Sequence, residues 1–97
     1  MKVEYDPRAV SDLNHSVDYY NRQRSGLGDE LRSEVYSAID RVCASPTQYP
    51  MVENNLRRSL VHRFPYSVLF RLIESDSIRI LVIRHQRRHP RFGIYRR

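Results

Sequence analysis

The stretch that decides the fold reads Tyr66-Ser67-Val68-Leu69-Phe70-Arg71-Leu72-Ile73-Glu74-Ser75-Asp76-Ser77-Ile78-Arg79-Ile80-Leu81-Val82-Ile83. Two runs of aliphatic and aromatic residues, 66–73 and 78–83, flank the polar tetrapeptide 74–77. Two such runs joined by a short polar segment are typical of a β-hairpin. The second run is apolar on both faces apart from Arg79, which indicates a strand inside a sheet.

A third strand is predicted upstream, over residues 56–64, before Pro65 interrupts the chain. Alternation places Arg57 and Arg63 on one face and Arg58 with His62 on the other. Parity alone does not say which face is buried. The second face also carries Leu56, Leu60 and Phe64, so we expect it to pack on the core, with Arg58 and His62 at the rim.

The N-terminal half changes to helical periodicity. Val3 and Tyr5 alternate with polar residues as in a short strand, and Asp6-Pro7 supplies a helix cap followed by proline at the first helical position. Apolar residues then recur at spacings of three and four to about residue 23, and again from Leu27 until Ser45-Pro46. Two helices with a short connection are expected to lie antiparallel.

The predicted order is therefore β-α-α-β-β-β, an α+β fold in one domain spanning residues 1–97. We expect the helical hairpin to pack on one face of a small, mainly antiparallel four-stranded sheet. Two helices cannot cover both faces, so the other face, or part of it, is predicted to stay open as a concave surface marked by arginines.

Charge is divided unevenly along the 97 residues. The net charge is +6, and Lys2 is the only lysine among the 17 basic residues. Residues 1–48 carry six basic and eight acidic side chains, whereas residues 49–97 carry eleven arginines and three acidic side chains. A field concentrated on one part of a small domain indicates a partner surface, here in the C-terminal half.

Several protein classes are disfavoured by the same composition. No apolar run approaches 18 residues and the N-terminus lacks the apolar core of a signal peptide, so we predict a cytoplasmic protein without membrane contact. The single cysteine, Cys43, excludes a disulfide framework and a multi-cysteine zinc site. His15 stands alone on the first predicted helix, and His85 with His89 lacks a predictable carboxylate partner. We expect no metal and no cofactor.

The densest chemistry lies in residues 84–97, which combine six arginines and two histidines with Phe92 and Tyr95. Arginine can clamp phosphate, histidine can transfer a proton, and an aromatic ring can stack on a base. These are the parts of a metal-independent ribonuclease, but also of a plain basic tail. The residues alone favour contact with an anion or a nucleic acid over catalysis.

An ordered set of short motifs resembles the RelE/ParE superfamily of bacterial type II toxins. The set covers nearly the whole chain and consists of Asp12-Leu13 with Tyr19-Tyr20, Leu27-Gly28, Ala38-Ile39, Ser45-Pro46, Arg57-Arg58, the segment 63–71 and the segment 83–90. The resemblance implies a small basic toxin that is neutralised by a cognate antitoxin through an acidic or amphipathic segment. Members similar to RelE cleave messenger RNA on the ribosome, whereas members similar to ParE inhibit DNA gyrase.

Two departures favour the ParE-like branch. Ser67 stands where the nucleases commonly carry an arginine that stabilises the cleavage transition state, and no lysine follows Lys2. Loss of one such donor commonly costs about 10² to 10³ in rate. The run His85-Gln86-Arg87-Arg88 with Pro90 also resembles this branch. We therefore expect a gyrase inhibitor, with an mRNA endonuclease as the alternative and a non-toxic RNA-binding module as the second alternative.

Three sets of site residues follow from this hypothesis. The expected target surface comprises Arg58, Arg63, Arg84, His85, Arg87, Arg88, Arg91 and Arg96. If the protein is a nuclease, the catalytic candidates are Arg63, His85, Arg88 and Tyr95. The antitoxin is expected to cover a groove around Leu13, Val17, Tyr20, Leu31 and Val35.

Overall fold

The computed structural model describes residues 1–97 and contains the predicted elements in the predicted order. The elements are β1 (Lys2–Tyr5), α1 (Pro7–Gln23), α2 (Leu27–Ala44), β2 (Arg57–Leu60), β3 (Tyr66–Glu74) and β4 (Ser77–His85), with 3-10 turns at Pro46–Gln48 and Glu53–Asn55. The sheet order is β1-β4-β3-β2. β1 runs parallel to β4, whereas the other pairs are antiparallel, so the α+β prediction is confirmed.

The geometry of the helical hairpin is fixed by the cap of α1 and by one close contact between α1 and α2. Asp6 accepts a hydrogen bond from the backbone N–H of Arg8 at 2.8 Å, which caps α1 as predicted. Gly28 lies against α1, where a Cβ atom would come within 2.1 Å of the Val17 carbonyl oxygen. Only glycine therefore allows the two helices to approach this closely. No helix is both long enough and apolar enough to cross a membrane.

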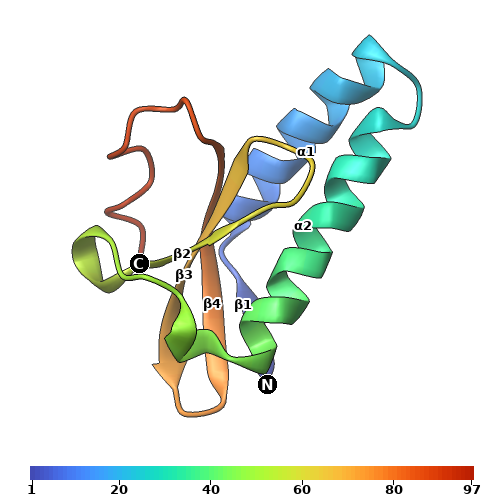
Figure 1. The fold of residues 1–97 in the computed structure, drawn as a ribbon. Helices are drawn as coiled ribbons and strands as arrows, with labels where there is room; N and C mark the ends of the chain where they lie inside the picture. Colours follow the sequence, from blue (N-terminus) through green and yellow to red (C-terminus); the bar gives the residue numbers. More distant parts are fainter.

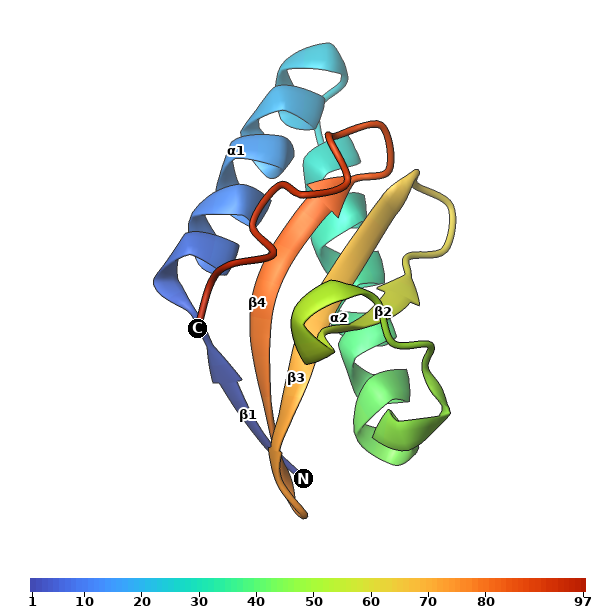
Figure 2. The ribbon, with the colours of Figure 1, turned by 90° about the vertical axis from the view of Figure 1, so that its left-hand side faces the viewer.

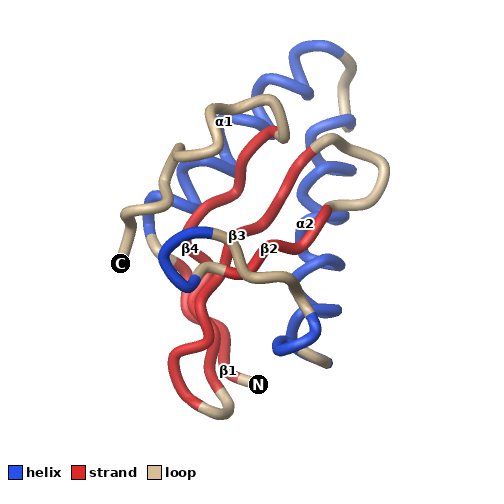
Figure 3. The backbone as a smooth tube through the Cα atoms, turned by 60° about the vertical axis from the view of Figure 1, so that its left-hand side comes forward, coloured by secondary structure: helices blue, strands red, loops and turns tan.

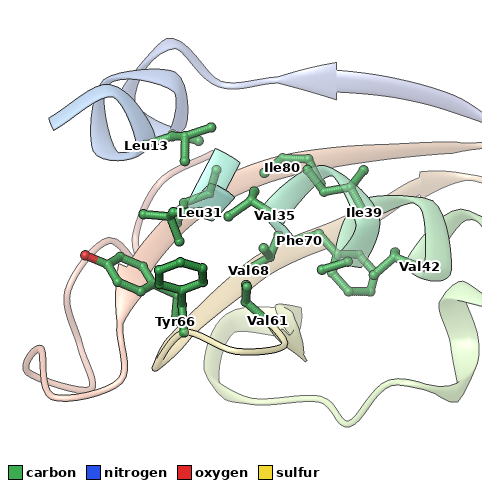
Figure 4. Close-up of a cluster of buried hydrophobic side chains, with 14 of the residues drawn as sticks. Leu13, Leu31, Val35, Ile39, Val42, Val61, Tyr66, Val68, Phe70 and Ile80 are labelled. Carbon is green, nitrogen blue, oxygen red and sulfur yellow. The ribbon is translucent and has the colours of Figure 1, made fainter. Parts of the chain in front are cut away.

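The main core lies between the hairpin and one face of the sheet (Figures 1 and 4). Leu13 of α1, and Leu31 and Val35 of α2, point into this layer. Val17 of α1 belongs to the same cluster. They pack against strand residues such as Phe70, which is fully buried. The apolar stripes recognised in the sequence are thus the faces that the helices bury against the sheet.

The predicted faces of the third strand were wrong. β2 ends at Leu60, and residues 61–65 form a loop in which Arg63 adopts a left-handed φ of 70°. Ser59 and Val61 are buried, whereas Leu60 is 54% exposed. The side that carries Arg57 therefore faces the helices. Its guanidinium is accommodated there because it donates to the carbonyl oxygens of Thr47 and Tyr49.

The second face of the sheet is covered in part, and its edge at Leu60, which is 54% exposed, stays open. Residues 86–97 fold back across this face, on the side opposite the helices (Figures 2 and 3). Ile94 is 2% exposed and completes a second apolar cluster with Leu56, Leu69, Leu81 and Val82. Gly93 has a φ of 77°, and a Cβ atom there would lie 2.6 Å from the Val82 side chain. Glycine is therefore needed where the segment crosses β4.

Candidate functional site

Ion pairs separate the arginines of the C-terminal half into two groups. Arg63, Arg79, Arg91 and Arg96 each lie within 4 Å of a carboxylate. No carboxylate partner is found for Arg57, Arg58, Arg71, Arg84, Arg87, Arg88 and Arg97. The positive charge counted in the sequence is thus partly neutralised inside the fold, and the unpaired group is where charge is left for an external anion.

Arg96 belongs to the fold rather than to a target surface, which corrects the expectation from the sequence. Its guanidinium donates to Asp12 Oδ2 at 2.6 Å and to the Leu81 carbonyl at 2.9 Å. Asp12 also accepts a hydrogen bond from the Ile83 N–H at 3.1 Å. The side chains of Arg96 and Asp12 are only 13% and 11% exposed. This pair fastens the C-terminal segment to α1.

Two other predicted target residues point elsewhere. Arg63 binds Glu30 at 2.6 Å and Glu34 at 3.3 Å, so it faces α2. Arg91 pairs with Glu53 at 3.3 Å and donates to the hydroxyl of Tyr95. Both arginines are already neutralised by carboxylates of this chain, so an external anion gains less from them than from the unpaired group.

Three of the unpaired arginines, Arg58, Arg84 and Arg88, line three adjoining hollows that we call the basic trough. The first, of about 390 Å³, lies between α1 and the end of β4 and is lined by Ser11, Asp12, His15, Ser16, Tyr66, Ile83, Arg84, His85, Arg88 and Phe92. It shares Arg84 with the second, of about 300 Å³, which is lined by Arg58, Leu60, Ser67, Arg84 and Gln86. The second shares Arg58 and Leu60 with the third, of about 320 Å³, which is lined by Arg41, Tyr49, Pro50, Arg58, Ser59, Leu60 and His62.

Strand register places the middle of the trough. Leu60 of β2 lies opposite Ser67 of β3, and Ser67 lies opposite Arg84 of β4. Neighbouring strands therefore bring these residues side by side at one end of the sheet. Ser67, which stands where the similar nucleases commonly carry an arginine, lines the trough and is 4% exposed.

Arg84 is half-buried and lies near a second cation, Arg58. Its Nη1 donates to the carbonyl oxygens of Pro90 and Phe92, both at 2.8 Å, which holds the guanidinium half-buried. Burial lowers the pKa of Arg84 below its usual value, and the positive charge of Arg58 lowers it further. The trough has one acidic residue, Asp12, which Arg96 already neutralises. A phosphate or carboxylate bound there would relieve this repulsion.

His85 and Arg88 are positioned by local contacts. The Nδ1 atom of His85 accepts a hydrogen bond from the Arg87 N–H at 3.0 Å, so the neutral ring carries its proton on Nε2. This ring meets Tyr66 edge to face, with centroids 5.3 Å apart. The guanidinium carbon of Arg88 lies 4.4 Å from the centre of the Phe92 ring. Stacking holds an exposed cation in place at low cost in side-chain entropy.

The four nuclease candidates do not come together. His85 and Arg88 line the first hollow. Arg63 is turned toward α2, and Tyr95 lines a separate basic hollow with Asn54, Asn55, Arg71, Arg79, Arg96 and Arg97. General acid–base catalysis requires its groups within hydrogen-bonding reach of one substrate. The structure brings together one histidine and the arginines, without the other two candidates.

Sequence reasoning missed the α1 side of the site and Arg41. Ser11, His15 and Ser16 line the first hollow, and Ser16 accepts a hydrogen bond from the Tyr66 hydroxyl at 3.0 Å. Residues 12, 15 and 16 share one helical face beside the buried stripe, and this spacing is the signal in the sequence that could have placed them at the site. No three histidine, cysteine or acidic side chains lie close enough to hold a metal ion.

The antitoxin groove expected around the helices is corrected by burial. Leu13, Val17, Leu31 and Val35 are at most 4% exposed, because the stripe that carries them packs on the sheet. Only Tyr20 is partly exposed, and it packs edge to face against Tyr19, Phe64 and Tyr66. A partner on the outside of this structure therefore cannot reach four of the five residues.

A family model described as the ParE toxin of the type II toxin-antitoxin system parDE matches residues 3–90. The chain belongs to this family. The match spans β1 through Pro90 and so includes both helices and the sheet. It confirms the predicted membership of the RelE/ParE superfamily on the ParE-like side and identifies the protein as a type II toxin, which implies an antitoxin partner.

A solved structure described as the chromosomal ParDE toxin-antitoxin system from P. aeruginosa is similar to the toxin with a TM-score of 0.76. The alignment covers 88% of this chain and 95% of that one, at 20% sequence identity. This likeness supports the fold, and the assignment to the family rests on the match to the family model. A search of curated proteins finds no significant match.

Proposed function

We propose that this toxin arrests growth by inhibiting DNA gyrase in the cytoplasm, and that the basic trough is the surface that contacts the target. The observation that carries the proposal is the line of Arg41, Arg58, Arg84 and Arg88, none of which has a carboxylate partner. Assignment to the ParE family supports the choice of gyrase over the ribosome.

Inhibition through this surface needs binding only. The planar guanidinium of arginine donates paired hydrogen bonds to phosphate and carboxylate groups. A guanidinium held beside another cation is stabilised most by such a partner. Arg84 and Arg58 are in this situation. The DNA segment held by gyrase supplies phosphates, so a toxin that binds there can block strand passage without reacting groups of its own.

The direct test is a supercoiling assay with purified gyrase, relaxed plasmid and the toxin. We expect blocked supercoiling or trapped cleavage complexes. The variant Arg58→Glu/Arg88→Glu should weaken inhibition at least about tenfold, because two favourable contacts become repulsive. Lys2→Glu/Arg22→Glu makes the same change of charge outside the trough and should inhibit like wild type. Full gyrase activity at saturating wild-type toxin would refute the proposal.

An mRNA endonuclease is the second candidate, and it is favoured by one observation. His85 shares the first hollow with Arg84 and Arg88, so a proton-transfer group lies beside two phosphate-binding groups. Primer extension on translated messages in arrested cells should then reveal new 5′ ends in register with codons. Intact messages during arrest would rule this candidate out. Harmless expression without the antitoxin would instead indicate an RNA-binding module.

A further inference from the structure

One guanidinium in the third hollow of the trough lacks a partner that its burial demands. Arg41 lies in the last turn of α2 and makes no hydrogen bond or ion pair, and its buried Nη2 is the only orphaned side-chain nitrogen or oxygen of its kind in the chain. A buried donor without an acceptor costs free energy, and a charged one costs more. The acceptor is therefore expected to come from outside this chain.

The surroundings of Arg41 define what that acceptor is attached to. The hollow is lined by the apolar surfaces of Tyr49, Pro50 and Leu60, with Arg58, Ser59 and His62 as the other polar residues and no acidic residue. Leu60 is 54% exposed. A free inorganic anion would leave the leucine in water. A carboxylate next to an apolar side chain satisfies both features, and this combination is characteristic of a peptide.

The backbone of β2 supplies the third feature. β2 is an edge strand, and the Arg58 N–H on its outer side donates to the Pro50 carbonyl at 3.0 Å. In an antiparallel ladder the groups that point outward alternate, so the Arg58 carbonyl and the Leu60 N–H also point outward. Residues 50–52 pair with the outer side of residues 56–58, and this covering segment ends at Pro50. The outer edge at Leu60 is therefore free to pair with an added strand.

We propose that the edge of β2 beyond Pro50 binds an extended acidic segment of the antitoxin. Its backbone pairs with the Arg58 carbonyl and the Leu60 N–H, one carboxylate reaches Arg41, and the adjacent apolar side chain covers Leu60. Alternation along a strand directs these two side chains to opposite faces of the sheet, as the positions of Arg41 and Leu60 require. The inference rests on the proposed role as a toxin only in its choice of partner.

The test measures the stability of the free toxin and the affinity of the complex in parallel. The antitoxin encoded beside the toxin is purified and titrated calorimetrically into wild-type toxin, Arg41→Gln and the matched control Arg22→Gln. Arg22 is an exposed arginine in the last turn of α1 and lies outside the trough. We expect Arg41→Gln to weaken binding roughly tenfold to a hundredfold, as for loss of a hydrogen bond to a charged group.

The thermal stability of the free toxin should not fall along with the affinity of the complex. Arg41→Gln removes an unsatisfied guanidinium, so its melting temperature should equal or exceed that of wild type. A merely structural Arg41 predicts a lower melting temperature with unchanged affinity, and that result would overturn the proposal. So would an affinity within twofold of wild type, or a loss of affinity for a DNA duplex but not for the antitoxin.

Hydrogen exchange gives a readout that needs no variant. The Leu60 amide should exchange rapidly in the free toxin and slowly in the complex, because the added strand accepts its hydrogen bond. An unchanged Leu60 exchange rate in the saturated complex would overturn strand addition. Growth arrest by the wild-type toxin alone tests the proposed function separately, since neither the titration nor the exchange measurement depends on what the toxin inhibits.

Discussion

Replacing Arg96 by alanine is expected to remove a large part of the stability of the toxin. The variant leaves Asp12, which is 11% exposed, without its bidentate partner, and it deletes the donor to the Leu81 carbonyl. Breaking a buried ion pair from one side costs about 3 to 5 kcal/mol. Asp12 keeps the Ile83 N–H as a donor, so we expect the lower end, about 3 kcal/mol. The total free energy of unfolding of a small domain is only about 5 to 15 kcal/mol.

The assay is urea unfolding at pH 7, compared with Arg91→Ala as the matched control. Arg91 and Glu53 also form an ion pair, but their side chains are 51% and 57% exposed, so this pair contributes less than about 1 kcal/mol. The neutral double variant Asp12→Leu/Arg96→Met should recover most of the loss, because no buried charge then lacks a partner. If Arg96→Ala costs no more than Arg91→Ala, the C-terminal segment is not fastened as described.

Three further changes have defined outcomes. Arg8 holds the pKa of the Asp6 carboxyl at about 2, below its usual value of 3.8, so this group stabilises the folded state above about pH 4 and the contribution is lost as the pH falls through 2. Asp6→Ala should therefore cost about 1 kcal/mol at pH 7 and little near pH 2, by urea unfolding. Gly28→Ala should cost about 3 kcal/mol by the same measurement, since its Cβ would meet the Val17 carbonyl oxygen at 2.1 Å. Leu56→Ala should cost roughly 2 to 5 kcal/mol and speed amide exchange at Ile94, because both belong to the second apolar cluster.

The elements that the sequence predicts well are those with local signals. The helical stripe of α1 and the polar turn between β3 and β4 depend on residues a few positions apart, and both are confirmed. The buried face of β2 was predicted wrongly because alternation defines two faces without saying which one meets α2. The left-handed φ of Arg63 ends the alternation after Val61, and no residue preference signals it.

The C-terminal segment and the site depend on contacts between distant residues. Arg96 and Asp12 are far apart in the sequence, and composition alone marks Arg96 as one more exposed cation. The apolar signal in this segment is limited to Phe92 and Ile94 around Gly93. The trough needs the end of β4 to lie beside α1, which depends on the parallel pairing of β1 with β4 and on the Ile83–Asp12 hydrogen bond. The charge excess was therefore predictable from the sequence, whereas its division into neutralised and free arginines was not.

The parallel pairing of β1 with β4 also affects the order in which a growing chain can fold. β1 is made before β4, but its only strand partner is residues 77–80 of β4. The helical hairpin can therefore form from local contacts, whereas the main apolar cluster needs residues up to Ile83 and the second cluster needs Ile94. Products truncated before β4 consequently lack the sheet, both complete clusters and the assembled trough.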